Sequence, residues 1–349
     1  MKRLVAWSLA FALYTALCAP PQARAHALPH GAAAPQGNNL SQVQITTTKV
    51  AGNVSMLVGS GGNIGVSAGP DGLLMIDDQY APLAEKIRAA LRELNPGRLK
   101  FVLNTHWHSD HTGGNANFGA DSTLVAHANV RARLASGSNA PGRNIPPAPA
   151  IALPIITFDT TLHIHFNGEE VRVIHFPAGH TDGDSIIFFT TSNVIHMGDH
   201  FFAGRFPFVD TGSGGSVEGL IRNVADVIAR APAGVKIIPG HGPLSTIDDL
   251  KTYHQMLIET RDIVRQRVAQ GRTLEQIKAE GLPEKWKSWG TGYINTESWI
   301  ETLFRSIRPG GSADLKTTTN DFGELFGHAR AGLAADEFSA RCTSAHHAN

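Results

Sequence analysis

Apolar and polar residues alternate in short blocks through most of the chain. In the first half, short apolar runs are separated by glycine-rich turns such as Gly59-Ser60-Gly61-Gly62, a pattern typical of β-strands. Between Leu83 and Leu94 the apolar residues recur every three or four positions with charges opposite, which predicts a helix. The strands predicted in this half are 54–58, 63–67, 73–76, 101–103 and 124–126.

The second half repeats the pattern with longer helices. Asn167-Gly168 separates two alternating runs and is the strongest short signal for a β-hairpin. Residues 136–154 are rich in Gly, Pro and Ala and predict an ordered loop or lid. The other predicted elements are strands at 162–166, 169–176, 186–190, 194–196 and 235–238, and helices at 217–229 and 246–268. We therefore expect a mixed α/β (α+β) fold, with two sheets packed face to face and helices outside.

The N-terminus has the pattern of a secretory signal. Lys2 and Arg3 precede a short apolar run, and Ala25 or Ala27 ends a small-residue cleavage site. The apolar run is shorter than the roughly 20 residues that a membrane span needs. We therefore expect a periplasmic or secreted protein. The predicted organisation is a signal peptide at 1–25, a flexible leader at 26–41, a folded domain at 42–309 with a C-terminal helical segment at 271–309, and a loosely ordered tail at 310–349.

Composition excludes some classes of partner and favours metal chemistry. The 30 basic residues equal the 30 acidic ones, so the chain lacks the basic excess of nucleic-acid-binding proteins. Signal cleavage would leave Cys342 as a lone cysteine, which cannot form an internal disulfide. The 17 histidines are the outlier, and several stand in tight motifs.

The densest motif is the run from His106 to His111, which reads His-Trp-His-Ser-Asp-His. Histidines two apart after a strand can point to the same side, so His106 and His108 can reach one metal ion. After a turn, Asp110 and His111 can face a second ion beside the first. The alternative is that this run is a solvated polar loop that binds no metal. Four possible ligands within six residues argue against that alternative.

Three more possible ligands stand beside glycines, each just after a predicted strand. They are His180 after Ala178-Gly179, Asp199 after Met197-Gly198, and His241 after Pro239-Gly240. Glycine permits tight turns and a close approach of the backbone to an ion. Each signal is weak alone, but the shared layout of strand, glycine and ligand favours one joint site.

The ordered set of His-x-His-x-Asp-His followed by His, Asp and His resembles the metallo-β-lactamase superfamily over roughly residues 46–307. The resemblance implies an αββα sandwich with the site at one edge between the sheets. By motif, His106, His108 and His180 would hold the first metal, and Asp110, His111 and His241 the second, with Asp199 bridging them. Asp77 looks like the family's early acidic position, which would orient a ligand, while the neighbouring Asp78 is expected to be solvated.

The chemistry implied is hydrolysis by two Zn²⁺ ions about 3.5–4 Å apart that share a hydroxide. Asp110 would orient this nucleophile and move its proton. Nitrogen and oxygen ligands favour zinc, although manganese or iron fits the same ligands. His108 argues against the iron redox branch, which usually has an acid at this position. No Ser/His/Asp arrangement is required.

The substrate class stays open between a small ester, thioester, lactone or β-lactam. Many β-lactamases of the superfamily carry cysteine where this chain has Asp199, and its lactonases often carry tyrosine where this chain has Phe202. Arg205 is a candidate to bind a substrate carboxylate. Gly59–Gly62 is a candidate mobile flap. The aromatic residues at 286–304 favour core or dimer contacts over substrate stacking.

We expect a small-molecule substrate, no nucleic-acid partner and a possible homo-oligomer. A β-lactamase, or a nuclease or phosphodiesterase of the same fold, is an alternative enzyme. A binding protein without catalysis is a third reading, and the complete ligand set argues against it.

Overall fold

The computed structural model describes residues 40–140 and 143–307. The predicted signal peptide, almost all of the leader and the predicted tail lie outside these residues, so the proposed boundaries stay predictions. No helix within the described ranges has the length and apolar character needed to cross a bilayer.

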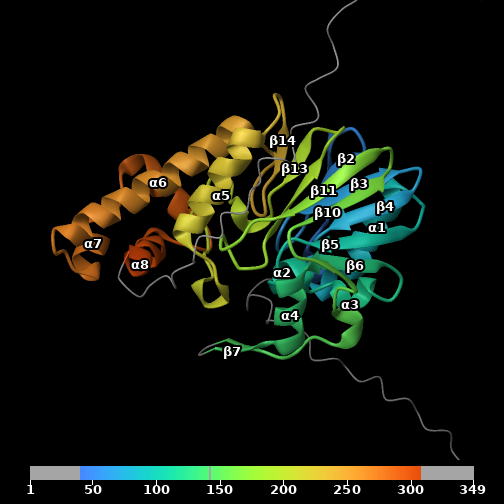
Figure 1. The fold of residues 1–349 in the computed structure, drawn as a ribbon, viewed down its shortest axis with the longest axis horizontal. Coiled ribbons are helices and arrows are strands. Elements are labelled where there is room, and N and C mark those ends of the chain that lie inside the picture. Colours follow the sequence, from blue (N-terminus) through green and yellow to red (C-terminus); the bar gives the residue numbers. More distant parts are fainter. Residues whose placement is uncertain (1–39, 141–142, 308–349) are drawn as a thin grey trace, which may run out of the picture. The chain divides into compact units, whose positions relative to one another are not determined.

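The first sheet has seven strands in the order β1-β2-β3-β4-β5-β6-β9 (Figure 1). The strands from β1 to β4 pair antiparallel, and those from β4 to β9 pair parallel. Parallel strands place their carboxyl ends at one edge of the sheet, where loops can converge. The bounds are β1 Thr46–Ala51, β2 Val54–Val58, β3 Ile64–Gly69, β4 Gly72–Ile76, β5 Leu99–Asn104, β6 Thr123–His127 and β9 Ile156–Phe158.

The second sheet has six strands in the order β10-β11-β12-β13-β14-β15. Asn167 and Gly168 both have positive φ and join β10 to β11, which confirms the predicted hairpin. The β13 and β14 strands pair parallel, and the other pairs are antiparallel. The bounds are β10 Thr161–Phe166, β11 Glu169–His175, β12 Ser185–Phe189, β13 Val194–His196, β14 Lys236–Ile238 and β15 Ser245–Thr246.

Strand β4 shows how the core is divided between two layers. Leu73 and Met75 pack with helix α1 (Ala84–Leu94), whereas Leu74 and Ile76 point into the space between the sheets. Because successive side chains of a strand alternate between its faces, an apolar run can be buried on both sides. The core between the sheets is completed from the opposite sheet by Val171, Val173, Ile187, Phe189, Val194 and Ile238.

Helices α5 (Val217–Arg230), α6 (Ile247–Ala269) and α8 (Thr296–Ile307) lie together beside the second sheet in Figure 1. Their apolar side chains share one buried core with residues of β11 to β14. The described part of the chain is therefore two sheets face to face with helices on both outer sides, which confirms the predicted αββα sandwich. The remaining helices are α2 Ser109–Thr112, α3 Asn115–Phe118, α4 Ala128–Ser136 and α7 Leu274–Glu280. The short 3₁₀ turns are Leu40–Gln42, Ala81–Leu83, Ala150–Ala152, Gly198–His200, Thr211–Ser213 and Glu284–Thr291.

The segment 136–154 is more regular than its composition indicates. It contains a small antiparallel pair, β7 (Ser138–Ala140) with β8 (Arg143–Ile145), where the sequence predicts a loop. Residues 146–149 line a cavity of about 60 Å³ together with Trp107 and Ser109, so this segment packs beside the histidine motif.

Candidate metal centre

All seven predicted ligands lie on segments that leave the ends of neighbouring strands. His106 and His108 follow β5, and Asp110 and His111 lie within the short helix α2. The other three ligands come from the second sheet: His180 follows β11, Asp199 lies in the turn after β13, and His241 follows β14. The structure brings them together in two neighbouring groups, His106, His108, His180 and Asp199, and Asp110, His111 and His241.

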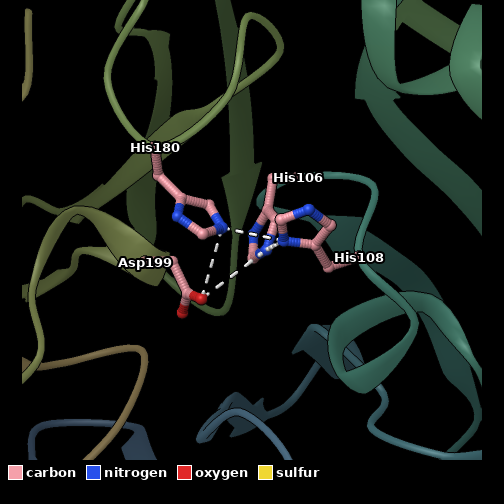
Figure 2. Close-up of side chains that lie close together, drawn as sticks. All are labelled: His106, His108, His180 and Asp199. Atoms are coloured by element: carbon pink, nitrogen blue, oxygen red, sulfur yellow. Dashed lines mark hydrogen bonds and ion pairs between the residues drawn. The ribbon is translucent and has the colours of Figure 1, made fainter. Parts of the chain in front are cut away.

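The first group has three imidazoles whose nitrogens face one another (Figure 2). His108 Nδ1 lies 3.1 Å from His106 Nε2 and 2.8 Å from His180 Nε2. The opposite nitrogens are held by neighbours. His180 Nδ1 donates to the Phe208 carbonyl at 2.8 Å, and His106 Nδ1 lies 3.0 Å from the Thr105 hydroxyl, which itself donates to Asp77.

These contacts fix which nitrogen of each ring carries the proton. A nitrogen that donates a hydrogen bond leaves the other nitrogen of a neutral imidazole with a lone pair. His106 and His180 thus present Nε2 lone pairs to the same point that His108 reaches with Nδ1. Three lone pairs within hydrogen-bond distance of one another repel unless a cation lies between them, so this group fits a metal ion.

The second group combines one carboxylate with two imidazoles. Asp110 Oδ2 lies 3.3 Å from His241 Nε2 and 3.6 Å from His111 Nε2. His111 Nδ1 donates to Asp77 Oδ2 at 2.7 Å, so the neutral ring has its lone pair on Nε2. Within each group the possible ligand atoms all lie within 4.8 Å of one another, which is close enough to surround a single ion.

Asp199 joins the two groups through its two carboxylate oxygens. Oδ2 lies 3.4 Å from His180 Nε2 and 3.8 Å from His106 Nε2. Oδ1 lies 3.1 Å from His111 Nε2 and 3.3 Å from His241 Nε2. One oxygen therefore faces each group, as a carboxylate that bridges two ions requires.

Two buried atoms at this junction lack hydrogen bonds. His111 Nε2 and Asp199 Oδ1 have no hydrogen-bond partner among the described residues, although they are only 3.1 Å apart. Burying a polar atom without a partner costs about 1–3 kcal/mol. A divalent cation would satisfy both atoms at once, and this is the second observation that fits metal at the site.

The electrostatics of the site differ between the two groups. Burial lowers the pKa of His180 to about 4 and also lowers that of His106, so both rings are neutral and able to bind metal. Burial acts the same way on His241, but the carboxylates of Asp199 and Asp110 outweigh it and raise the pKa of that ring to about 9. These carboxylates thus attract positive charge to the second group, which is what a cation site requires.

Asp77 is a buried carboxylate that contacts His111 and Thr105. It is fully buried, and its carboxylate accepts hydrogen bonds from His111 Nδ1 and from the backbone and side chain of Thr105. Its φ of 62° lies in the left-handed region, a conformation that costs free energy outside glycine. Asp77 therefore contacts a ligand of the second group, and its orienting role stays a prediction.

Asp78 is not solvated as expected. It is fully buried, accepts the Gly114 N–H at 2.8 Å through Oδ1, and burial raises the pKa of its carboxyl group well above the usual value. The sequence expectation was wrong because the chain after β4 runs under the histidine motif and not along the surface.

The glycine run 59–62 forms a packed wall of the site. The Gly62 N–H donates to the Asp110 carbonyl at 3.0 Å, and Gln79 donates to the Gly62 carbonyl at 2.7 Å. A Cβ on Gly62 would lie 2.1 Å from the His111 ring. Glycine is therefore needed for close approach, and these contacts favour a fixed support over the predicted mobile flap.

Aromatic side chains form one side of the site. Phe202 stacks on His241 with ring centroids 5.1 Å apart. The Phe208 ring centroid lies 5.8 Å from that of His108. Phe208 also meets Tyr293 edge-on, with centroids 6.4 Å apart. Tyr293 is 90% exposed. Arg205 lies between Phe202 and Phe208, and its side chain is exposed next to Gly292. Its predicted role in binding substrate stays a prediction.

Asp210 and the Phe208 carbonyl accept hydrogen bonds from two candidate ligands, and sequence reasoning missed both contacts. The Asp210 carboxylate accepts a hydrogen bond from His108 Nε2 at 2.8 Å. Their 102-residue separation leaves no motif that could reveal the pair. The only local signal is Asp-Thr-Gly-Ser at 210–213, in which the aspartate caps a turn by accepting from Ser213.

The comparisons with known proteins agree with this geometry. The family model described as the metallo-beta-lactamase superfamily matches residues 48–252. A hydroxyacylglutathione hydrolase from Rhodospirillum rubrum is 29% identical over 161 residues, which are 46% of this chain and 54% of that protein. The alpha subunit of a 2,4-dinitroanisole O-demethylase from a Nocardioides species is 27% identical over 142 residues, 39% of this chain and 40% of that subunit. The chain thus spans about half or less of the curated relatives that it matches.

Solved structures share the fold at low sequence identity. A metallo-beta-lactamase from Pontibacter korlensis aligns with a TM-score of 0.51 and 16% identity, covering 61% of this chain and 99% of that one. A double mutant of the sec-alkyl sulfatase PisA1 aligns with a TM-score of 0.58 and 15% identity, covering 75% of this chain and 50% of that one. At these identities the structures support the fold alone.

Proposed function

The chain belongs to the metallo-β-lactamase superfamily and is a metal-dependent hydrolase, and on this premise we propose an exported enzyme that uses two zinc ions to cleave a small ester, thioester, lactone or β-lactam. The family match confirms the resemblance drawn from the histidine motif. The number and identity of the ions, the export and the scissile bond belong to the proposal.

The observation that carries the proposal is the position of Asp199 between the two ligand groups. Its Oδ2 faces His180, and its Oδ1 faces His111 and His241. A site for one ion needs no such shared carboxylate. Two ions with a common ligand account for the orientation of both oxygens and for the buried atoms that lack hydrogen bonds.

A pair of divalent cations would supply a nucleophile from water near neutral pH and would polarise the bond under attack. Asp110 is the group of this chain best placed to handle the proton of that water. Its carboxylate is 23% exposed, whereas Asp199 is 5% exposed. Asp110 can therefore face both the site and an incoming substrate. Burial alone would raise its pKa, but His111 and His241 outweigh burial and hold the pKa below the usual value, so the carboxylate stays ionised.

A thioester is the first bond to test. The similarity to a hydroxyacylglutathione hydrolase supports it, because that relative is named for an acyl group carried on a thiol. The aromatic wall of Phe202, Phe208 and Tyr293 supports an uncharged acyl group beside the metals. Lactone and β-lactam rings present the same electrophilic carbonyl.

The proposal is tested by measuring turnover of a thioester, a lactone, nitrocefin and a phosphodiester, with and without a chelator. We expect turnover of at least one carbonyl substrate, its loss with the chelator and its return on adding Zn²⁺. A His106→Ala variant purified in parallel reports any contaminating hydrolase. Turnover that survives both the chelator and this substitution would contradict the proposal, and preference for the phosphodiester would reassign the substrate class.

Export is tested by identifying the N-terminus of the protein made in a bacterial host. The basic residues, apolar run and small-residue site at the start of the sequence support cleavage after Ala25 or Ala27. We expect the mature chain to begin at His26 or Leu28 and to be found outside the cytoplasm. A cytoplasmic chain that retains Lys2 would contradict export.

A further inference from the structure

The segment from Phe208 to Ser213 contacts two of the three histidines of the first group. The Phe208 carbonyl accepts from His180 Nδ1, and the Asp210 N–H donates to the His180 carbonyl at 2.9 Å. The Asp210 carboxylate accepts from His108 Nε2. One short segment thus holds the ring of His108 and both the ring and the backbone of His180.

His108 differs from the other two histidines of this group in the nitrogen that it presents. It turns Nδ1 toward the shared point, whereas His106 and His180 turn Nε2. A neutral imidazole can bind metal through Nδ1 only when its proton is on Nε2. The carboxylate of Asp210 lies 2.8 Å from that Nε2 atom and is 9% exposed, so it favours this proton position in a largely dry environment.

We propose that Asp210 is a positioning residue that keeps the proton of His108 on Nε2 and so directs Nδ1 to the first metal. The inference rests on the proposed metal site and is independent of the substrate. Asp210 would act on the first group as Asp77 acts on the second, where it accepts from His111 Nδ1 at 2.7 Å. Each group would then have one buried carboxylate that orients one of its rings.

The partners of Asp210 make Asp210→Asn an informative change. The Ser213 N–H donates to Oδ1 at 3.2 Å, so the amide oxygen of an asparagine would be retained at that position. The amide nitrogen would then face His108 Nε2 and donate to it. This contact would favour the proton on Nδ1 and block the atom that binds metal.

The first test is a titration of metal-free protein with Zn²⁺ against a chromophoric chelator. We expect Asp210→Asn to weaken the binding of one of the two ions by roughly 10–100-fold. Asp226→Asn is the matched control, because Asp226 is 39% exposed on α5 and pairs with Arg230 on the surface, and it makes the same chemical change. We expect this control to bind both ions as the unsubstituted protein does.

A purely structural role would lower the melting temperature of the metal-free protein, and the positioning role predicts little change there. Equal affinity of Asp210→Asn and unsubstituted protein for both ions would overturn the inference. If the unsubstituted protein itself binds no Zn²⁺, the proposed function fails, which is a separate result.

A second measurement needs no variant and covers the case in which Asp210→Asn does not fold. Nitrogen NMR of zinc-loaded protein with ¹⁵N-labelled histidine reports which ring nitrogen carries a proton and which binds metal. We expect one ligand histidine with metal on Nδ1 and a slowly exchanging proton on Nε2, and the other rings of the first group with the reverse arrangement. Finding metal on Nε2 in all three rings of that group would contradict the proposal.

Discussion

At the level of single side chains, the centre uses its carboxylates for two tasks. Asp110 and Asp199 face the imidazole nitrogens that would bind metal, and Asp77 and Asp210 accept from the opposite nitrogens of His111 and His108. The first task, binding metal, needs a carboxylate within the ligand set. The second task, orienting a ring, needs a carboxylate that accepts from the ring nitrogen facing away from the metal. Only the metal-binding carboxylates belong to the motif, so Asp210 had to be found from the structure.

The part-exposed carboxylate of Asp110 can be tested by substitution. We expect Asp110→Asn to reduce turnover by roughly a hundredfold or more, because the amide cannot accept the proton of the attacking water. The three histidines of the first group are untouched, so one ion should stay bound. Steady-state kinetics combined with metal analysis measures both effects. Near-normal turnover would remove Asp110 from the mechanism.

Gly62 tests how closely the backbone must approach the ligands. An added Cβ would lie 2.1 Å from the His111 ring, so Gly62→Ala must displace that ring. We expect turnover to fall by about a hundredfold, since small displacements of catalytic groups have effects of this size. Ser60→Ala, in the same turn, adds no atom and serves as the control. Equal kinetics for both variants would show that the turn moves away without consequence.

At the level of helices and strands, prediction succeeded where burial gives a strong periodic pattern. Strands β2 and β13 lie where the sequence places them, and α5 and α6 begin or end within one residue of expectation. The edge strand β1 was missed because its sequence, TTTKVA, is largely exposed and lacks alternation. The β7–β8 pair was missed because Gly and Pro in that stretch indicate a loop.

The ligands were predictable for a different reason. All seven stand beside a glycine or within one compact motif, so local sequence marks them. Contacts between distant segments leave no such mark. His108 with Asp210 and the Gly62 backbone with Asp110 depend on how strands far apart in the chain bring their loops to one edge.

Some aromatic residues after α6 are buried in the core, and one is exposed on the surface. Trp299 is fully buried and its Nε1 donates to Thr260 at 3.0 Å, which links α8 to α6. Trp286, Leu303 and Phe304 are also buried in this core, whereas Tyr293 is exposed. The predicted core role therefore holds for these buried residues, and Tyr293 is the one exposed beside the site.

This division gives a stability test. We expect Trp299→Phe to lower the free energy of unfolding by about 1–3 kcal/mol, because it leaves a cavity and removes the hydrogen bond to Thr260. Tyr293→Phe on the same segment should change it by less than about 0.5 kcal/mol. Denaturant unfolding at a fixed zinc concentration measures both. Equal effects of the two substitutions would contradict the assigned core.

Across the described chain, the metal centre lies where the two sheets meet, and each sheet supplies ligands. His106, His108, Asp110 and His111 follow a strand of the first sheet, and His180, Asp199 and His241 follow strands of the second. Metal bound there would tie the sheets together, and ligands that bind only the folded state stabilise it.

Metal removal should therefore affect stability as well as turnover. We expect a chelator to abolish turnover and to lower the melting temperature, and we expect the melting temperature to rise with zinc concentration. Calorimetry over a series of zinc concentrations measures this linkage. A melting temperature that is independent of zinc, in protein shown to contain the metal, would mean that the ions do not link the sheets.

The most direct measurement is a crystal structure of the zinc-loaded protein with anomalous diffraction data collected at the zinc absorption edge. We expect two peaks about 3.5–4 Å apart, one among His106, His108 and His180 and one among Asp110, His111 and His241, with one Asp199 oxygen toward each. A single peak in fully loaded protein, or an Asp199 carboxylate turned away from both ions, would contradict the account.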